Sequence, residues 1–426
     1  MNRALAHCIV RSLRVTGPRE EPLAQLGKFS RPDWERTLSW LDDSGLALYL
    51  LERVDRAGAD NALPQPIRAR LQENLASNRQ RVAQMKREFE FFNSRFEAAG
   101  VEFVVLKGFA LVPDFCPDAV LRPQYDYDYL VHPECEEAAR QVLQAAGYVQ
   151  KNQSPGLEPT GETRFVSQPL SFPSANEDYY AATLPRGVEL HLGLWEPSCD
   201  GMRLVVPGDI LDRRRQAESQ DMRFPMLADD DALLFQILHA YHHMLSYWCR
   251  PSCFLEIAHF MAAPTTGASF WEGFCRRISH YKQLPEISSL VFAMAAKLFE
   301  APVPDQVVSR MRGLHSPALS AWVKRYGEPW ALTPFPGSKL TLFILHEFID
   351  DSAGWDKIRR NQLLPFHRPA RASESRDGTP GSKQEARRNQ RRFVLGRVKF
   401  HFRALLSYAW HAPQWNRVKR GIRGLA

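Results

Sequence analysis

The chain has 426 residues, of which 44% are hydrophobic, and a formal net charge of +7. This length exceeds what one hydrophobic core supports and predicts two or three domains. The sequence contains no run of roughly 18 apolar residues, so no transmembrane segment is expected, and no signal peptide is recognised. Seven cysteines without a framework pattern indicate reduced thiols and a cytoplasmic protein.

Residues 1–100 predict a helical N-terminal region. Apolar residues such as Trp34 and Leu41 recur at helical spacing. The same pattern predicts one long helix from about Ile67 to Ala99. Gly100 follows it in the position where a glycine commonly ends a helix.

The pattern changes after this helix, and a mixed core is predicted over residues 101–215. The predicted strands are residues 101–106, 125–131, 163–172 and 187–194. A helix is expected to run from Lys107–Gly108 to Phe115. This alternation indicates an α+β fold, with a small mixed sheet flanked by N-terminal and C-terminal helical regions.

Helical periodicity returns in residues 216–367, which predict a helical domain. Residues 368–392 contain almost no apolar side chains and predict a flexible linker. Residues 393–426 predict one basic amphipathic helix. From Lys383 to the end there are twelve Lys or Arg and one acid, so residues 383–426 are a candidate contact with nucleic acid or an anionic surface. The alternative is a solvated helix that docks its apolar face.

Two acids separated by one residue, Asp126 and Asp128, lie in the second predicted strand. Side chains alternate along a strand, so both carboxylates point to one face and Tyr127 and Tyr129 to the other. Two neighbouring carboxylates repel unless a cation lies between them, and hard oxygen ligands suit Mg²⁺ or Mn²⁺. Such a pair is what the transfer of a nucleotidyl group requires.

A third acid is predicted on a neighbouring strand, because a two-ion site needs two or three carboxylates. Glu189 is the candidate, as third metal ligand or as base. His191 shares its face and is interpreted as a supporting or structural histidine.

Phosphate contacts are predicted before the acidic strand. Gly108 would let the backbone approach a phosphate, and Lys107 would supply a positive charge to it. Arg122 would do likewise, or would pair structurally with Asp126 or Asp128.

A group of histidines and cysteines further along the chain has the residue types of a zinc site. Its members are His239, His242, His243, Cys249 and Cys253. They lack a compact four-ligand spacing and have apolar neighbours. A packed helix with polar contacts to the core is therefore favoured over zinc.

Together these motifs resemble the nucleotidyltransferase superfamily, and most of all an uncharacterised bacterial family of polymerase-β-like nucleotidyltransferases. The resemblance covers about residues 30–260. The matching motifs are Leu106–Lys107–Gly108, Arg122–Pro123, Asp126 to Val131, Glu189–Leu190–His191 and His239 to His243. It implies a nucleotidyltransferase-type sheet followed by a helical region. The chain departs from the family in having Glu189 where Asp is more common, and tyrosines beside the acids.

The sequence therefore predicts a metal-dependent transferase that moves a nucleoside monophosphate from a nucleoside triphosphate to an unknown acceptor. Asp126, Asp128 and Glu189 would be the catalytic and metal-binding residues. The predicted substrate-binding residues are Lys107, Gly108, Arg122 and His191. The alternatives are a catalytically inactive module with this fold, and an RNA-binding protein that uses its basic tail.

Overall fold

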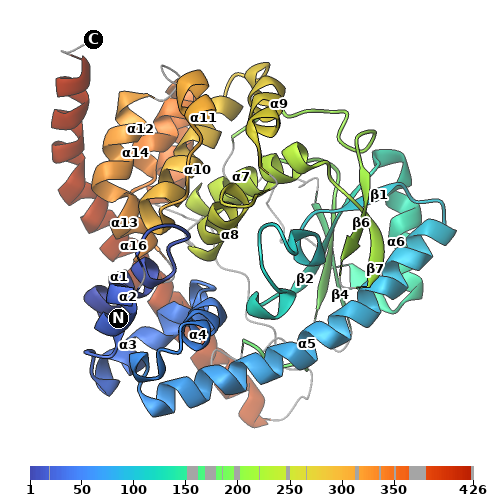
Figure 1. Cartoon of the computed structure of the whole chain (residues 1–426), viewed down its shortest axis with the longest axis horizontal. Coiled ribbons are helices and arrows are strands. Elements are labelled where there is room, and N and C mark those ends of the chain that lie inside the picture. The colour runs from blue at the N-terminus through green and yellow to red at the C-terminus, as the bar shows by residue number, and fades with distance from the viewer. Residues whose placement is uncertain are drawn as a thin grey trace.

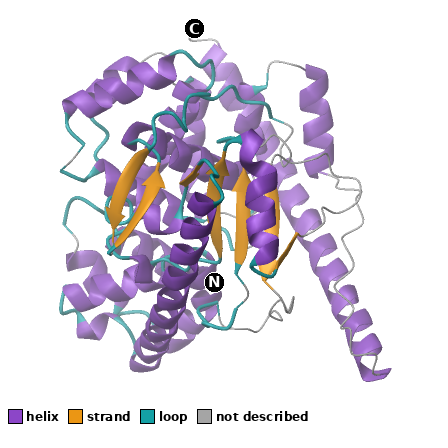
Figure 2. Ribbon diagram, turned by 90° about the vertical axis from the view of Figure 1, so that its right-hand side faces the viewer, coloured by secondary structure: helices purple, strands orange, loops and turns teal. Residues whose placement is uncertain are grey.

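The computed structural model describes residues 1–18, 20–150, 162–167, 179–184, 186–195, 202–219, 221–245, 250–264, 266–311, 316–334, 337–349, 352–363 and 380–423. These residues form one mixed sheet surrounded by helices, which confirms the predicted α+β class (Figure 1, Figure 2). None of the helices in these ranges combines the length and apolar character needed to cross a bilayer.

The sheet has seven strands in the order β3-β4-β5-β2-β1-β7-β6. The strands are β1 (Phe103–Val105), β2 (Asp126–Val131), β3 (Tyr148–Gln150), β4 (Glu162–Ser167), β5 (Gly187–His191), β6 (Arg215–Ser219) and β7 (Met222–Met226). β2 lies at the centre, antiparallel to β1 and parallel to β5. The acidic strand is therefore held by a neighbour on each side.

The helices of the N-terminal region and the core are α1 (Arg3–Ser12), α2 (Glu20–Leu26), α3 (Arg31–Asp43), α4 (Ala47–Arg56), α5 (Gln65–Ala98) and α6 (Glu136–Ala145). Those that follow the sheet are α7 (Asp229–Leu245), α8 (Ser252–Met261), α9 (Ala268–Ser279), α10 (Leu284–Phe299), α11 (Asp305–Met311), α12 (Pro317–Trp322), α13 (Glu328–Ala331), α14 (Leu342–Leu345), α15 (Ser352–Leu363) and α16 (Pro380–Arg423). The long helix predicted from about Ile67 is α5, and Gly100 after it has a φ of 68°.

One face of the sheet is covered by α5 and α6. Tyr127 and Tyr129 are buried there in one apolar cluster with Phe89 and other residues of α5. Their hydroxyl groups donate to Glu88 at 2.7 Å and Asn93 at 3.0 Å, both on α5. Tyrosines therefore suit these positions, because the helix supplies an acceptor for each buried hydroxyl.

The opposite face meets the helical region. Val104, Leu106 and Leu130 belong to a second cluster that includes buried residues of α7 and α8. The Gln236 side-chain amide on α7 donates to the Leu106 carbonyl oxygen at 3.3 Å. The acids of β2 share this face, so the helical region lies beside them.

Two expected boundaries are wrong. Lys107–Gly108 does not open a helix to Phe115, because only a short 3-10 turn, Gly108–Leu111, follows. α16 begins at Pro380, so part of the expected linker is helical. Arg, Gln, Lys, Glu and Ala predominate there and are good helix formers even without an apolar face. Residues 168–172 of one expected strand, and Cys249, lie outside the described residues.

Candidate active site

The carboxylates of Asp128 and Glu189 lie side by side because of the register between β2 and β5. The two strands are parallel, and Asp128 and Glu189 are direct Cα partners, so their side chains leave the same face. His191 follows two residues later on that face. The ligand atoms of Asp128, Glu189 and His191 all lie within 4.8 Å of one another.

Lys107 forms an ion pair with one member of this group, Asp128. Its Nζ is 2.7 Å from Asp128 Oδ1, and the two side chains are only 11% and 2% exposed. The Leu106 amide donates to the Asp128 carbonyl oxygen at 3.0 Å, which fixes the turn that carries Lys107 against β2. His191 Nε2 lies 3.2 Å from the same Oδ1 atom.

The charges of this group stabilise one another. Burial alone would raise the pKa of Asp128, but the ammonium of Lys107 and the hydrogen bond from His191 hold it below its usual range. Burial would lower the pKa of Lys107, but the carboxylates of Asp128, Asp126 and Glu189 raise it above its ordinary value. Both groups are therefore ionised at neutral pH.

A pH dependence of stability follows from these shifts. The Asp128 contribution is present above the unfolded pKa, near 4, and is lost as the pH falls; that of Lys107 is present below about 10 and is lost as the pH rises. We compare the free energy of unfolding of the wild type with that of a Lys107→Met/Asp128→Asn variant. The difference between the two is expected to be constant from about pH 5 to about pH 9. Urea titrations across this range and below it measure the difference. A difference that stayed unchanged well below pH 4 would contradict the ionised pair.

Asp126 begins β2 on the same face as Asp128 and is half-buried. Its Cα partner on β5 is Gly187. The charge of Asp126 acts on Lys107. The Asp126 carboxylate does not belong to the close group formed by Asp128, Glu189 and His191. All three predicted acids thus act electrostatically on one ammonium group.

Arg164 is a site residue that the sequence analysis missed. It lies on β4 as the Cα partner of Glu189, and its Nε is 3.4 Å from Glu189 Oε1. A basic residue near the middle of a predicted strand was the only signal available. The partner depends on strand order, which local pattern does not reveal.

Gly108 holds the turn after β1 in a left-handed conformation, with a φ of 69°. A Cβ atom at this position would overlap the side-chain amide of Gln124. That amide donates to the Asp126 carbonyl oxygen at 2.9 Å. The glycine therefore allows a close approach between the turn and the start of β2.

We expect Gly108→Ala to destabilise the protein by more than the roughly 1–2 kcal/mol of an unfavourable φ, because the overlap with Gln124 adds to it. Gly100→Ala is the matched control, since Gly100 has a φ of 68° and open space around it. Thermal unfolding compares the two variants. Equal losses would show that the contact with Gln124 adds no strain.

Arg122 is buried away from solvent and pairs with a different acid from those expected. Its Nε donates to Glu256 Oε1 on α8 at 3.2 Å, and both side chains are almost completely buried. The interpretation in which Arg122 pairs with Asp126 or Asp128 is therefore wrong. This contact ties the segment before β2 to the helical region.

Comparison with known protein families identifies the family of this chain. The model described as "uncharacterised nucleotidyltransferase" matches residues 30–300, more than half of the chain. The matched range contains β1, β2 and β5 with all the site residues above, and continues through α7 and α8. No match was found among curated proteins.

Proposed function

Since the chain belongs to the uncharacterised nucleotidyltransferase family, we propose that it transfers a nucleoside monophosphate from a nucleoside triphosphate to an acceptor hydroxyl or phosphate. One observation carries the proposal. Asp128 and Glu189 are Cα partners on adjacent parallel strands, and with Asp126 they act on a single buried cation. Rigid strands that bring several carboxylates to one place are what the divalent metal ions of this reaction require.

Mg²⁺ or Mn²⁺ is the proposed cofactor, and the donor set fits it. Carboxylate oxygens are the ligands that these hard ions prefer, and Asp128 is held in its ionised form. Asp126 and Asp128 would hold the metal, and Glu189 would complete the site or accept a proton from the acceptor. A bound divalent ion would stabilise the negative charge that develops on the phosphate oxygens.

Lys107 and the turn at Gly108 would face the phosphates. The Lys107 ammonium lies among the three acids, so it can compensate phosphate charge next to the metal ligands. His191 would orient Asp128 through their contact of 3.2 Å. Arg122 is assigned to holding the fold, because its Nε is engaged with Glu256. A cytoplasmic location stays part of the proposal, consistent with the unpaired cysteines among the described residues.

An inactive module with this fold is the second candidate. It is favoured by the same Lys107–Asp128 contact of 2.7 Å, because an ammonium group that stays on the carboxylate would exclude a metal ion. Nucleotide binding cannot separate the two candidates, since both could bind. Pyrophosphate release separates them, because only the enzyme produces it.

The test is a screen with the purified full-length chain. Each of the four labelled ribonucleoside triphosphates is offered with Mg²⁺ or Mn²⁺ and a cell extract as the source of acceptor. The proposal expects a labelled product and pyrophosphate with the wild type and neither with Asp126→Asn. Pyrophosphate is measured relative to extract without the added chain. Wild-type release no greater than that background would support the inactive module, and release above it that is equal in both proteins would contradict the role of Asp126 as a metal ligand.

A further inference from the structure

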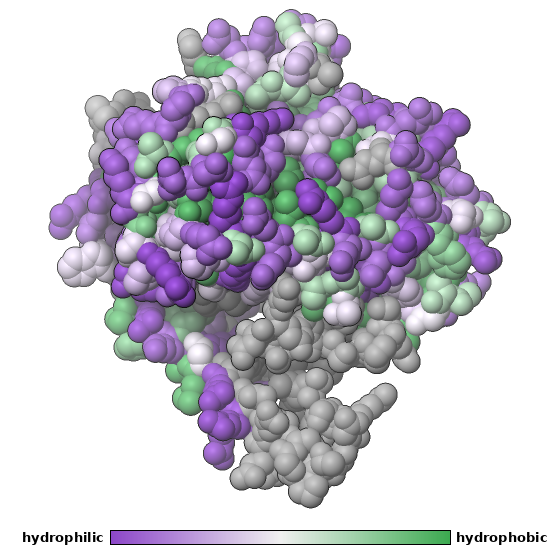
Figure 3. Space-filling model, turned by 60° about the horizontal axis from the view of Figure 1, so that its bottom comes forward, coloured by the Kyte–Doolittle hydropathy of each residue, from purple (hydrophilic) through white to green (hydrophobic). Residues whose placement is uncertain are grey.

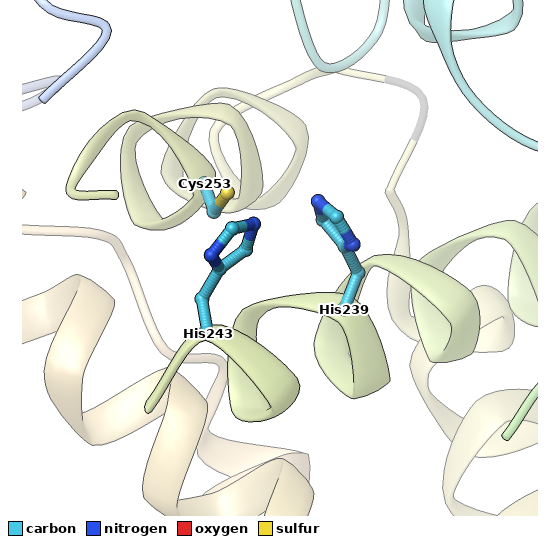
Figure 4. Close-up of side chains that lie close together, drawn as sticks. All are labelled: His239, His243 and Cys253. Carbon is cyan, nitrogen blue, oxygen red and sulfur yellow. The ribbon is translucent and has the colours of Figure 1, made fainter. Parts of the chain in front are cut away.

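Two histidines of α7 and one cysteine of α8 converge beside the candidate active site. His239 and His243 are one helical turn apart, and Cys253 faces them from the next helix (Figure 4). Their ligand atoms all lie within 4.8 Å of one another. The two rings are nearly perpendicular, at 86°, with centroids 4.7 Å apart. Two packed helices therefore present three donor atoms to one point.

Two of these donors have no other polar partner within the described part of the chain. His239 makes ring contacts with Phe235 and His243 but no hydrogen bond to a described residue. The Cys253 thiol is buried and unpaired and likewise makes no hydrogen bond to a described residue. Cys253 is buried and His239 is partly buried; since buried polar groups are normally satisfied, a further ligand would complete this arrangement.

We propose that His239, His243 and Cys253 bind a thiophilic divalent metal ion, with Zn²⁺ as the expected ion. Imidazole and thiolate ligands select zinc over magnesium. Three protein ligands leave one coordination position for water or a substrate atom. The site is distinct from the proposed Mg²⁺ site, whose ligands are carboxylates, and the inference does not depend on nucleotidyl transfer.

The protonation states suit this role. Burial, with the nearby charge of Lys107, lowers the pKa of His239 well below its usual value, so the ring is neutral and a lone pair is free. Burial raises the pKa of Cys253 to about 12, so the metal-free site holds a thiol. The charged groups that act on Cys253 are Glu256, Arg250, Arg122 and Lys107. Metal binding therefore releases the thiol proton, and affinity rises with pH.

The test measures metal in the full-length protein purified under reducing conditions. We expect about one Zn²⁺ per chain by elemental analysis, and a thiolate-to-metal absorption band when Co²⁺ replaces it. Cys253→Ser should abolish the band, and His239→Gln should lose the metal. Cys275→Ser, at another buried free cysteine, and Asp126→Asn are the controls that should retain both.

Two results would overturn the zinc site. One is a wild type that shows no Co²⁺ band after reconstitution, which needs no variant to interpret. The other is a band or a zinc content that is the same in Cys253→Ser as in the wild type. Circular dichroism of each variant checks that a loss of metal does not reflect unfolding.

The outward face of α16 carries a second, independent inference. α16 packs one side against the helical region, where Tyr408 and Trp415 stack on Phe343. Its other side exposes five large apolar residues that recur every three or four positions and are 54–73% exposed: Leu395, Val398, Phe402, Leu406 and Trp410. The lower part of the helix stands clear of the body in Figure 2.

The charge around this apolar stripe points to one partner. Arg391, Arg392, Lys399 and Arg403 are exposed along the same part of the helix, and no acid occurs between Glu385 and the end of the chain. Elsewhere, on the face in Figure 3, hydrophilic residues predominate and apolar ones occur in small groups. We infer that α16 docks on an anionic lipid surface, with the stripe in the headgroup region and the basic residues on lipid phosphates.

The test uses the full-length chain and vesicles of phosphatidylcholine with or without phosphatidylglycerol. We expect sedimentation with the anionic vesicles only, and loss of binding in the Leu395→Ser/Phe402→Ser/Trp410→Ser variant. Val205→Ser, at an exposed valine away from α16, is the control that should still bind. Unchanged binding by the triple variant would overturn the inference. The inference would also be overturned if the chain bound single-stranded RNA instead of vesicles and the triple variant retained that binding.

Discussion

Replacing Asp126 with asparagine is expected to lower nucleotidyl transfer about a thousandfold or more, with little change in stability. Asp126 is half-buried at the start of β2 and forms no ion pair with another described residue. The substitution removes a proposed metal ligand but leaves no buried charge unpaired. Pyrophosphate release and urea unfolding measure the two effects on the same protein.

Asp128→Asn provides the contrast. It should also abolish turnover, but it removes the negative charge that lies 2.7 Å from the buried Lys107 ammonium. Breaking a buried pair typically costs about 3–5 kcal/mol, and the remaining charges of Asp126 and Glu189 place the expected loss at the lower end. The Lys107→Met/Asp128→Asn variant should recover stability but not activity. Turnover at the wild-type rate in Asp126→Asn or Asp128→Asn would rule out the proposed metal site.

Alternation along β2 made much of the site predictable. Because strand side chains alternate, the sequence alone placed Asp126 and Asp128 on one face and the tyrosines on the other, in agreement with the register of β2 and the burial of the tyrosines. The pairing of Asp128 with Glu189 depended in addition on β5 lying next to β2. Glu189 was chosen because it shares a strand face with His191 in a predicted strand, and local pattern does not determine strand order.

Contacts between distant parts of the chain could not be predicted in this way. Lys107 was expected to face a phosphate, and nothing local indicated that it would lie on Asp128, across an antiparallel strand pair. Arg122 and Glu256 are 134 positions apart, and their pairing depends on how α8 packs against the core. Gly108 was predicted to free the backbone for a phosphate, whereas its close neighbour is the Gln124 side chain. In each case the tertiary packing, not the local propensity, determines the partner.

Breaking the Arg122–Glu256 ion pair is expected to cause the second large loss of stability. Glu256→Leu is expected to lower the free energy of unfolding by about 3–5 kcal/mol, because it leaves the Arg122 guanidinium buried without its ion-pair partner. Arg122→Met/Glu256→Leu should recover most of that loss, since well-packed apolar residues often replace a buried ion pair at no net cost. Glu272→Leu, at an exposed acid of α9, is the control and should change stability little.

The same double variant shows whether Arg122 has a structural role only or also contacts the triphosphate. If Arg122 acts only by joining the segment before β2 to α8, the refolded double variant should release pyrophosphate at close to the wild-type rate. If Arg122 also contacts the triphosphate, the double variant will be stable but will release pyrophosphate more slowly than the wild type. The loss of rate caused by Arg122→Met will then be larger at low nucleotide concentration. We expect the first result, because the Arg122 side chain is almost completely buried and its Nε already donates to Glu256.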